Sequence, residues 1–146
     1  MGFFNLSVMT STMTLTDFDG LLQAARNQPE PQRLLFVFVC AELPESATAD
    51  QYGRHERREG GTLRPVLCVD KLPTEVASFR ALDDESASTG IAWDLVFVAA
   101  LDGRGGMAPS NDEAAQPLRL MVNTINDGQV NRFAAFDRDG EPVQFY

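Results

Sequence analysis

The sequence is poor in lysine, histidine and cysteine. Its 146 residues include two cysteines, one histidine and twelve lysines and arginines together, against twenty-one aspartates and glutamates. The net charge at pH 7 is therefore −9, and the single lysine is Lys71. Because nucleic acids and anionic membrane surfaces bind through a cationic face, this composition disfavours both as partners.

Long hydrophobic runs are also missing. The longest, residues 34–41 and 95–101, are much shorter than the roughly 18–20 apolar residues that a membrane span needs. The first sixteen residues contain no lysine or arginine, so they lack the charged start of a secretory signal. We therefore expect a cytoplasmic protein.

The length corresponds to one domain, since domains commonly have roughly 100–200 residues. Helical patterning begins only after Met13, which leaves Met1, Met9 and Met13 as alternative starts. We expect residues 1–13 to form a disordered or loosely ordered tail and residues 14–146 to form a single domain.

The few cysteines and the one histidine do not suggest a metal site. Cys40 and Cys68 lie inside apolar runs without metal-ligand spacing, which indicates packed thiols. A disulfide between them is the alternative if their strands are neighbours. His55 lies among arginines, with no cysteine or carboxylate placed to form a catalytic dyad. We expect no metal and no cofactor, and the sequence leaves enzymatic activity uncertain, with the balance against it.

Helical and strand patterns alternate along the chain. The predicted helices cover residues 16–29, 48–59, 73–90 and 110–128, and the predicted strands cover residues 33–41, 65–69, 93–101, 132–136 and 142–146. Alternation of this kind favours right-handed crossovers and a parallel sheet. We therefore predict a single α/β domain. It has a mixed, mostly parallel sheet of about five strands, helices packed on the sheet, and a C-terminal β-hairpin.

A glycine-rich loop follows the strand that ends near Leu101. Gly103, Gly105 and Ala108 have the G-x-G-x-x-A spacing of a dinucleotide-binding turn. The next helix, however, begins at the Ser110 cap, after the motif rather than within it. A flexible strand-to-helix loop is therefore the favoured interpretation.

Charged residues also follow two predicted strands. Asp70 and Lys71 come after one strand, and Asp102 and Arg104 come after another. If these strands are adjacent, the four side chains converge at one edge of the sheet, where Arg104 can clamp a phosphate or a carboxylate. The alternative is that the aspartates cap turns and the cations are solvated. The candidate ligand-binding residues are Asp70, Lys71, Asp102, Gly103, Arg104, Gly105 and Gly106.

Three stretches, residues 28–38, 66–71 and 99–106, resemble an uncharacterised family of small acidic bacterial proteins. Members are sometimes labelled "ribonucleotide reductase subunit alpha". The resemblance implies a bacterial cytosolic protein and transfers no catalytic residue. The label does not fit the residues, because a reductase large subunit needs a far longer chain, a radical-forming cysteine and a redox pair of cysteines.

Two functions follow from these observations. The first is a non-enzymatic binding or regulatory module that associates with itself, as a homodimer, or with another protein. It predicts an exposed apolar patch that includes Phe133, Phe136, Phe145 and Tyr146. The second is a protein or enzyme that binds a small anionic ligand, bearing a phosphate or carboxylate, at the ends of the strands.

Overall fold

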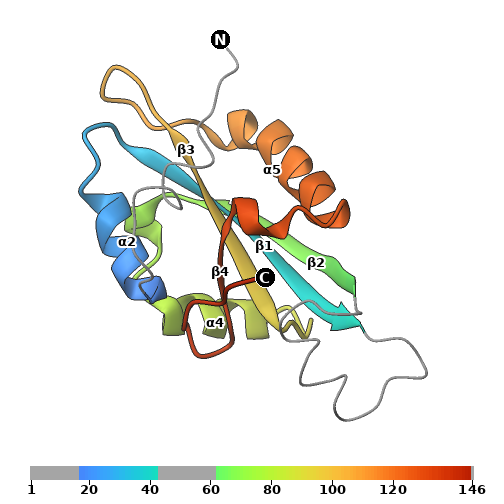
Figure 1. The fold of residues 1–146 in the computed structure, drawn as a ribbon. Coiled ribbons are helices and arrows are strands. Elements are labelled where there is room, and N and C mark those ends of the chain that lie inside the picture. Colours follow the sequence, from blue (N-terminus) through green and yellow to red (C-terminus); the bar gives the residue numbers. More distant parts are fainter. Residues whose placement is uncertain (1–16, 43–61, 146) are drawn as a thin grey trace.

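Two long apolar runs form the central strands of the sheet in the computed structural model, which describes residues 17–42 and 62–145 (Figure 1). The sheet has four strands in the order β2-β1-β3-β4. They are β1 (Gln32–Glu42), β2 (Thr62–Lys71), β3 (Leu95–Asp102) and β4 (Ala134–Phe136). Every neighbouring pair is antiparallel.

The prediction of a mostly parallel sheet of about five strands is therefore wrong. The strands β2 and β3 do run in the same direction, and they are joined through the 3₁₀ turn η1 (Pro73–Glu75) and the helix α4 (Phe79–Ala87). The strand β1 lies between them and runs the opposite way. A run of apolar residues shows that both faces of a strand are buried, but it does not show the direction of the neighbouring strands.

The C-terminal hairpin is much reduced compared with the prediction. β4 has three residues, and beyond the turn only an isolated bridge joins Pro142 to Phe136. Two backbone bonds make this bridge: the N–H of Val143 donates to the carbonyl of Ala135 at 2.9 Å, and the N–H of Asp137 donates to the carbonyl of Glu141 at 3.0 Å. The described residues thus contain no fifth strand. The predicted tail at residues 1–13 and the predicted helix at residues 48–59 lie outside them.

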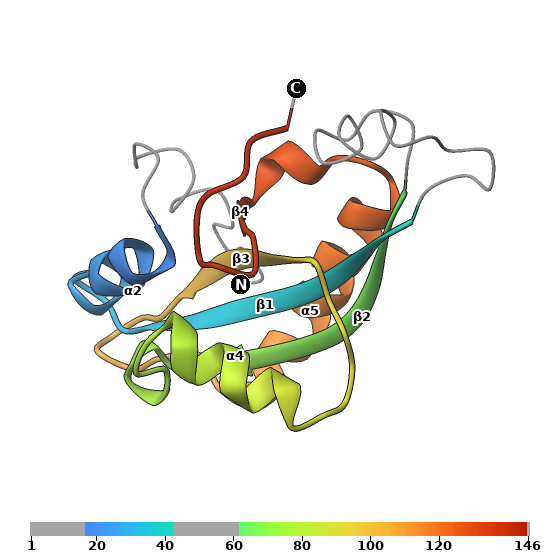
Figure 2. The ribbon, with the colours of Figure 1, turned by 90° about the horizontal axis from the view of Figure 1, so that it is seen from below.

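Helices cover both faces of the sheet (Figure 2). The helix α2 (Phe18–Arg26), η1 and α4 lie on one face. The helix α5 (Asn111–Asn126) and the 3₁₀ turn η2 (Val130–Arg132) lie on the other. Because side chains alternate along a strand, β1 and β3 contribute to both cores.

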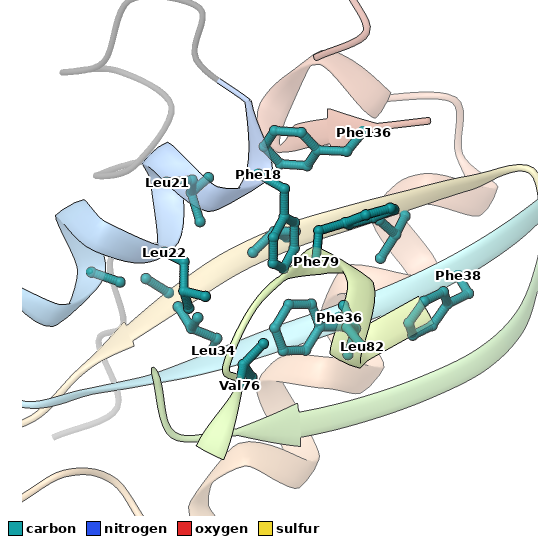
Figure 3. Close-up of a cluster of buried hydrophobic side chains, with 14 of the residues drawn as sticks. Phe18, Leu21, Leu22, Leu34, Phe36, Phe38, Val76, Phe79, Leu82 and Phe136 are labelled. Atoms are coloured by element: carbon teal, nitrogen blue, oxygen red, sulfur yellow. The ribbon is translucent and has the colours of Figure 1, made fainter. Parts of the chain in front are cut away.

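The first core, on the α2 and α4 face, is rich in aromatic rings (Figure 3). The ring of Phe18 lies 5.3 Å from that of Phe79, 5.4 Å from that of Phe136 and 6.0 Å from that of Phe36. The second core, on the α5 face, contains Leu35, Val37, Val39, Phe97, Ala99, Leu101, Ala114, Met121, Ile125, Val130, Phe133 and Ala135. Strand β1 thus joins two separate cores.

The helix ends follow local rules closely. Asp17 caps α2, because its carboxylate accepts a 2.9 Å bond from the N–H of Gly20. Ser110 is the N-cap of α5, as predicted, and it forms a capping box with Glu113 through bonds of 3.1 and 2.8 Å. These caps fix where each helix begins relative to the sheet.

Candidate functional site

The two groups of predicted ligand-binding residues lie at the same end of the sheet, but on strands that are not adjacent. β2 and β3 both end there, with the beginning of β1 between them. Lys71 is opposite Leu34, and Asp102 is opposite Gln32. The four charged side chains were expected to converge if these two strands were adjacent, and the strands are not adjacent.

Asp70 points to the α5 face and belongs to a dense polar network. Its carboxylate accepts 2.8 Å bonds from Nη1 of Arg33 and from Nδ2 of Asn111. Nε of Arg33 also donates to the carbonyl of Pro109, at 2.7 Å. The side chains of Arg33 and Asp70 are only 13% and 11% exposed. The network ties the beginning of α5 to β1 and β2.

Lys71 points to the opposite face, because consecutive residues of a strand alternate. Its Nζ lies 2.8 Å from Oε2 of Glu85 in α4. The lysine side chain is 19% exposed and that of Glu85 is 55% exposed. The sheet itself therefore separates Lys71 from Asp70.

Asp102 is bonded to a buried amide. Its Oδ1 accepts a 2.7 Å bond from Nε2 of Gln32, a residue that is 1% exposed. The other amide atom, Oε1 of Gln32, is buried and has no hydrogen-bond partner among the described residues. No sequence pattern pointed to this glutamine, since it lies at the polar beginning of an apolar run.

The glycine-rich loop is a tight turn. The backbones of Arg104 and Met107 exchange bonds of 3.0 and 3.1 Å, and Gly105 and Gly106 between them have φ of 63° and 80°. Two consecutive residues with positive φ define the type I′ turn of a β-hairpin. The N–H of Gly106 also donates to Oε1 of Glu30, at 2.8 Å. Since these N–H groups bond within the protein, the loop does not resemble an open phosphate cradle.

Arg104 acts electrostatically on the first turn of α5. The pKa of Glu113 is lowered first by hydrogen bonds from the backbone and side chain of Ser110, and further by the charge of Arg104. Asp70 contacts the same turn through Asn111. Of the predicted ligand residues, Asp70 and Arg104 therefore both border the beginning of α5, whereas Lys71 does not. Their role in ligand binding stays a prediction.

The two cysteines are free and lie three positions apart in register. Cys68 is opposite Val37, whereas Cys40 is opposite Arg64. The prediction of packed thiols is wrong for Cys68, which is exposed, although partial burial raises the pKa of its thiol. Cys40 is half-buried, and its thiol donates to the carbonyl of Ala92 at 3.0 Å.

The predicted aromatic patch is not exposed. Phe133 and Phe136 are 6% and 2% exposed and belong to the two cores. Phe145 is half-buried, and its ring stacks on that of Phe97 at 5.8 Å. Tyr146 lies outside the described residues. The patch prediction fails because both faces of the sheet are covered, so the aromatic residues of the C-terminal segment have cores to enter.

The outer side of β2 is the feature that sequence reasoning missed. β2 is the terminal strand of the sheet, and none of its ten residues is buried. In β1 and β3, by contrast, six consecutive residues are buried. Among the described residues, no strand pairs with the outer side of β2, as Figures 1 and 2 also show.

Hydrogen bonds elsewhere in the sheet show which backbone groups of β2 point outward. The carbonyl of Val39 accepts from Asp94, and the N–H of Ala41 donates to the Asp94 side chain, so both point toward β3. In an antiparallel strand, successive residues alternate between their two neighbours. The residues of β1 that face β2 are therefore Leu34, Phe36 and Phe38, which are opposite Lys71, Val69 and Leu67. It follows that the N–H and C=O groups of Cys68 and Asp70 point outward.

Two features hinder the pairing of a further strand with the first half of β2, on its outer side. The register shifts between Phe38 and Val39, which leaves Val66 as an extra residue in a β-bulge. Pro65, opposite Val39, has no N–H, and the same alternation turns that position outward. Both features hinder pairing with a further strand. Residues 67–71, in contrast, form a regular open segment, which we call the open edge of β2.

Comparisons with known proteins give no relative: no family model, no curated protein and no solved structure matches the chain. Within residues 17–42 and 62–145, no helix is long and apolar enough to cross a membrane. The same residues contain no group of three or more histidines, cysteines, aspartates or glutamates arranged to hold a metal ion.

Proposed function

We propose that this chain is a non-enzymatic binding module of the bacterial cytosol that associates with itself, and that the open edge of β2 is its interaction surface. The observation that carries the proposal is the position of β2, a ten-residue strand at the end of the sheet with no buried residue. A strand with a free side offers unpaired N–H and C=O groups to another chain.

The half-covered side chains of β2 support the same interpretation. Val66, Leu67 and Val69 pack against the first core but are only partly buried. Leu63 has the same relation to the second core. A further strand beside β2 would remove more of their apolar surface from water, a gain of roughly 25 cal/mol per Å².

The polar residues at the end of the sheet favour this function over a small-molecule site. Asp70, Lys71 and Asp102 each contact a different side chain of the protein: Arg33, Glu85 and Gln32. The contacts of Asp70 and Lys71 lie on opposite faces of the sheet. A ligand that contacts both would have to displace ion pairs on two faces at once.

Sedimentation equilibrium of the full chain tests the proposal. Wild type is compared with Cys68→Pro over an approximately hundred-fold range of concentration, because a dimer is recognised by its dependence on concentration. The N–H of Cys68 points outward, so proline removes no bond to β1 and, like Pro65, obstructs only the outer side. We expect wild type to associate and Cys68→Pro to remain monomeric.

The matched control is Cys68→Ala, which keeps the N–H group and should associate like wild type. Circular dichroism and thermal unfolding establish that both variants fold. A wild-type chain that is monomeric at every concentration would contradict self-association. A folded Cys68→Pro variant that associates as strongly as wild type would exclude the open edge of β2 as the surface.

A further inference from the structure

We infer that the occupant of the open edge is β2 of a second copy of this chain, paired antiparallel about a two-fold axis that passes through Val69. The inference rests on the proposed function and goes beyond it, because it specifies which residues meet. In this register, residue pairs across the axis have numbers that add up to 138. Cys68 of each copy is then opposite Asp70 of the other, and Val69 is opposite Val69.

The backbone groups select this register. Between the bulge at Val66 and the end of β2, the outward-pointing residues are Cys68 and Asp70. Each contributes one N–H and one C=O group. When Cys68 of each copy is opposite Asp70 of the other, the N–H and C=O groups of both residues form hydrogen bonds in each chain. A two-fold axis through Cys68 would instead pair Asp70 with the irregular backbone at Val66.

The side chains on the first-core face are complementary to themselves in this register. Val69 meets Val69 of the second copy in a pair without direct hydrogen bonds, where side chains approach most closely. Leu67 is opposite Lys71, whose aliphatic stem can cover it while its Nζ stays near Glu85. Leu67 and Val69 are the partly buried side chains that lack a covering neighbour on the outer side.

Charges are also complementary. Antiparallel pairing carries Arg64 of each copy toward the segment that follows β2 in the other, where Glu75 of η1 is exposed. Among the described residues, Arg64 forms an ion pair with Glu42 at 2.9 Å, with side chains that are 57% and 51% exposed. Such an exposed pair is weak and leaves Arg64 available for a second carboxylate.

The same features limit the pairing to a second copy of this edge. Pro65 and the bulge at Val66 restrict regular pairing to residues 67–71, so a long extended peptide would gain little from the rest of β2. A second copy adds the two symmetric contacts between Arg64 and Glu75. The net charge of −9 on each copy opposes association, so the pairing should strengthen as salt shortens the screening length to about 8 Å at 0.15 M.

Disulfide trapping tests the register. The chain carries Val69→Cys together with Cys40→Ser and Cys68→Ser, so that residue 69 is the only cysteine. Residues in a pair without direct hydrogen bonds have Cα atoms about 4.5 Å apart, within the roughly 4.4–6.8 Å that a disulfide spans. Under mild oxidation we expect a covalent dimer to form in most of the chains. Sedimentation before oxidation measures whether the variant associates.

Two controls place the sole cysteine elsewhere on the same edge. Leu67→Cys, with both native cysteines changed to serine, puts the thiols four residues out of register, roughly 13 Å apart at about 3.3 Å per residue. The second control keeps the native Cys68 and carries only Cys40→Ser, which places its thiols two residues out of register. We expect at least a ten-fold slower rate of crosslinking in both controls than in Val69→Cys.

The outcomes separate the register from the proposed function. Faster crosslinking of the native Cys68 than of Val69→Cys would overturn the axis through Val69 and leave pairing at the open edge intact. A dimer in sedimentation with no crosslink from any of the three positions would overturn both the register and the surface. If Val69→Cys proves unfolded, hydrogen exchange of wild type tests whether Cys68 and Asp70 pair with the second copy. The amides of Cys68 and Asp70 should then become protected as concentration rises, and unchanged exchange in a dimeric sample would overturn the inference.

Discussion

Gly103 lies where two backbone carbonyls come together. A Cβ atom at this position would be 2.2 Å from the carbonyl oxygen of Met107 and 2.3 Å from that of Pro31. The residue is a glycine because the end of β3 packs directly against the chain that enters β1. This close packing, rather than an approach to a phosphate, explains the first glycine of the loop.

Gly103→Ala should therefore lower the free energy of unfolding by about 2–3 kcal/mol, because the backbone at Pro31 or Met107 has to move. Gly105→Ala is the matched control. A Cβ there meets no atom within 4 Å, and only the φ of 63° opposes it, at about 1 kcal/mol. Urea unfolding of both variants measures the difference. Equal losses of stability in the two variants would show that the carbonyl groups of Met107 and Pro31 can move aside without cost.

The polar residues at the end of the sheet illustrate what residue types alone can predict. The sequence correctly placed Asp70, Lys71 and Asp102 near the ends of strands. It could not show that Asp70 meets Arg33 and Asn111, because those contacts join residues 37 and 41 positions apart in the chain. Only the sheet order and the position of α5 create them.

Among the elements, α5 was the most predictable. The sequence predicts a helix over residues 110–128 that begins at a Ser110 cap, and the structure confirms a helix there, Asn111–Asn126, with Ser110 as its N-cap. The direction of the strands was unpredictable for a physical reason. Antiparallel strands covered by helices on both faces bury the same apolar side chains as parallel ones.

The capping box of α5 makes stability depend on pH. The pKa of Glu113 is lowered from its ordinary value of 4.5, chiefly by bonds from Ser110. A carboxylate with a lowered pKa in the folded state stabilises the protein above about pH 4.5, and this contribution disappears as pH falls through the lowered pKa. Glu113→Gln has no such titration and keeps the box geometry.

We therefore expect wild type to lose more stability than Glu113→Gln when pH falls from about 6 to about 3. Urea unfolding midpoints of both proteins across this range make the comparison. Ser110→Ala removes the side-chain hydroxyl but keeps the backbone N–H, the larger cause of the lowered pKa, so this variant should retain most of the pH dependence of wild type. Parallel pH profiles of wild type and Glu113→Gln would contradict the role of the capping box.

At the scale of the whole molecule, the two cores share the same central strands. Phe36 and Phe38 of β1 belong to the first core, and Val37 and Val39 to the second. The only tryptophan, Trp93, is 3% exposed in the first core. A destabilising substitution in the second core should therefore also change the unfolding reported by Trp93 in the first core. Both cores include side chains of β1, so they should unfold together.

Met121→Ala, in the second core, tests this coupling. We expect a loss of about 2–5 kcal/mol in the free energy of unfolding, because a fully buried side chain leaves a cavity. The unfolding midpoint reported by Trp93 fluorescence should shift as much as the one reported by circular dichroism. A fluorescence midpoint that stays at the wild-type value would show that the two faces unfold separately.

The sequence by itself determined the positions of the two central strands, the helix near residues 18–26 and the beginning of α5, since these depend on neighbours within a few residues. The tertiary structure decided the strand order, the antiparallel directions, the burial of Phe133 and Phe136, and the open edge of β2. These features depend on which distant segments meet. A strand that pairs on one side and a strand that pairs on both sides have the same local pattern of residues, so the open edge of β2 could be recognised only in the folded sheet.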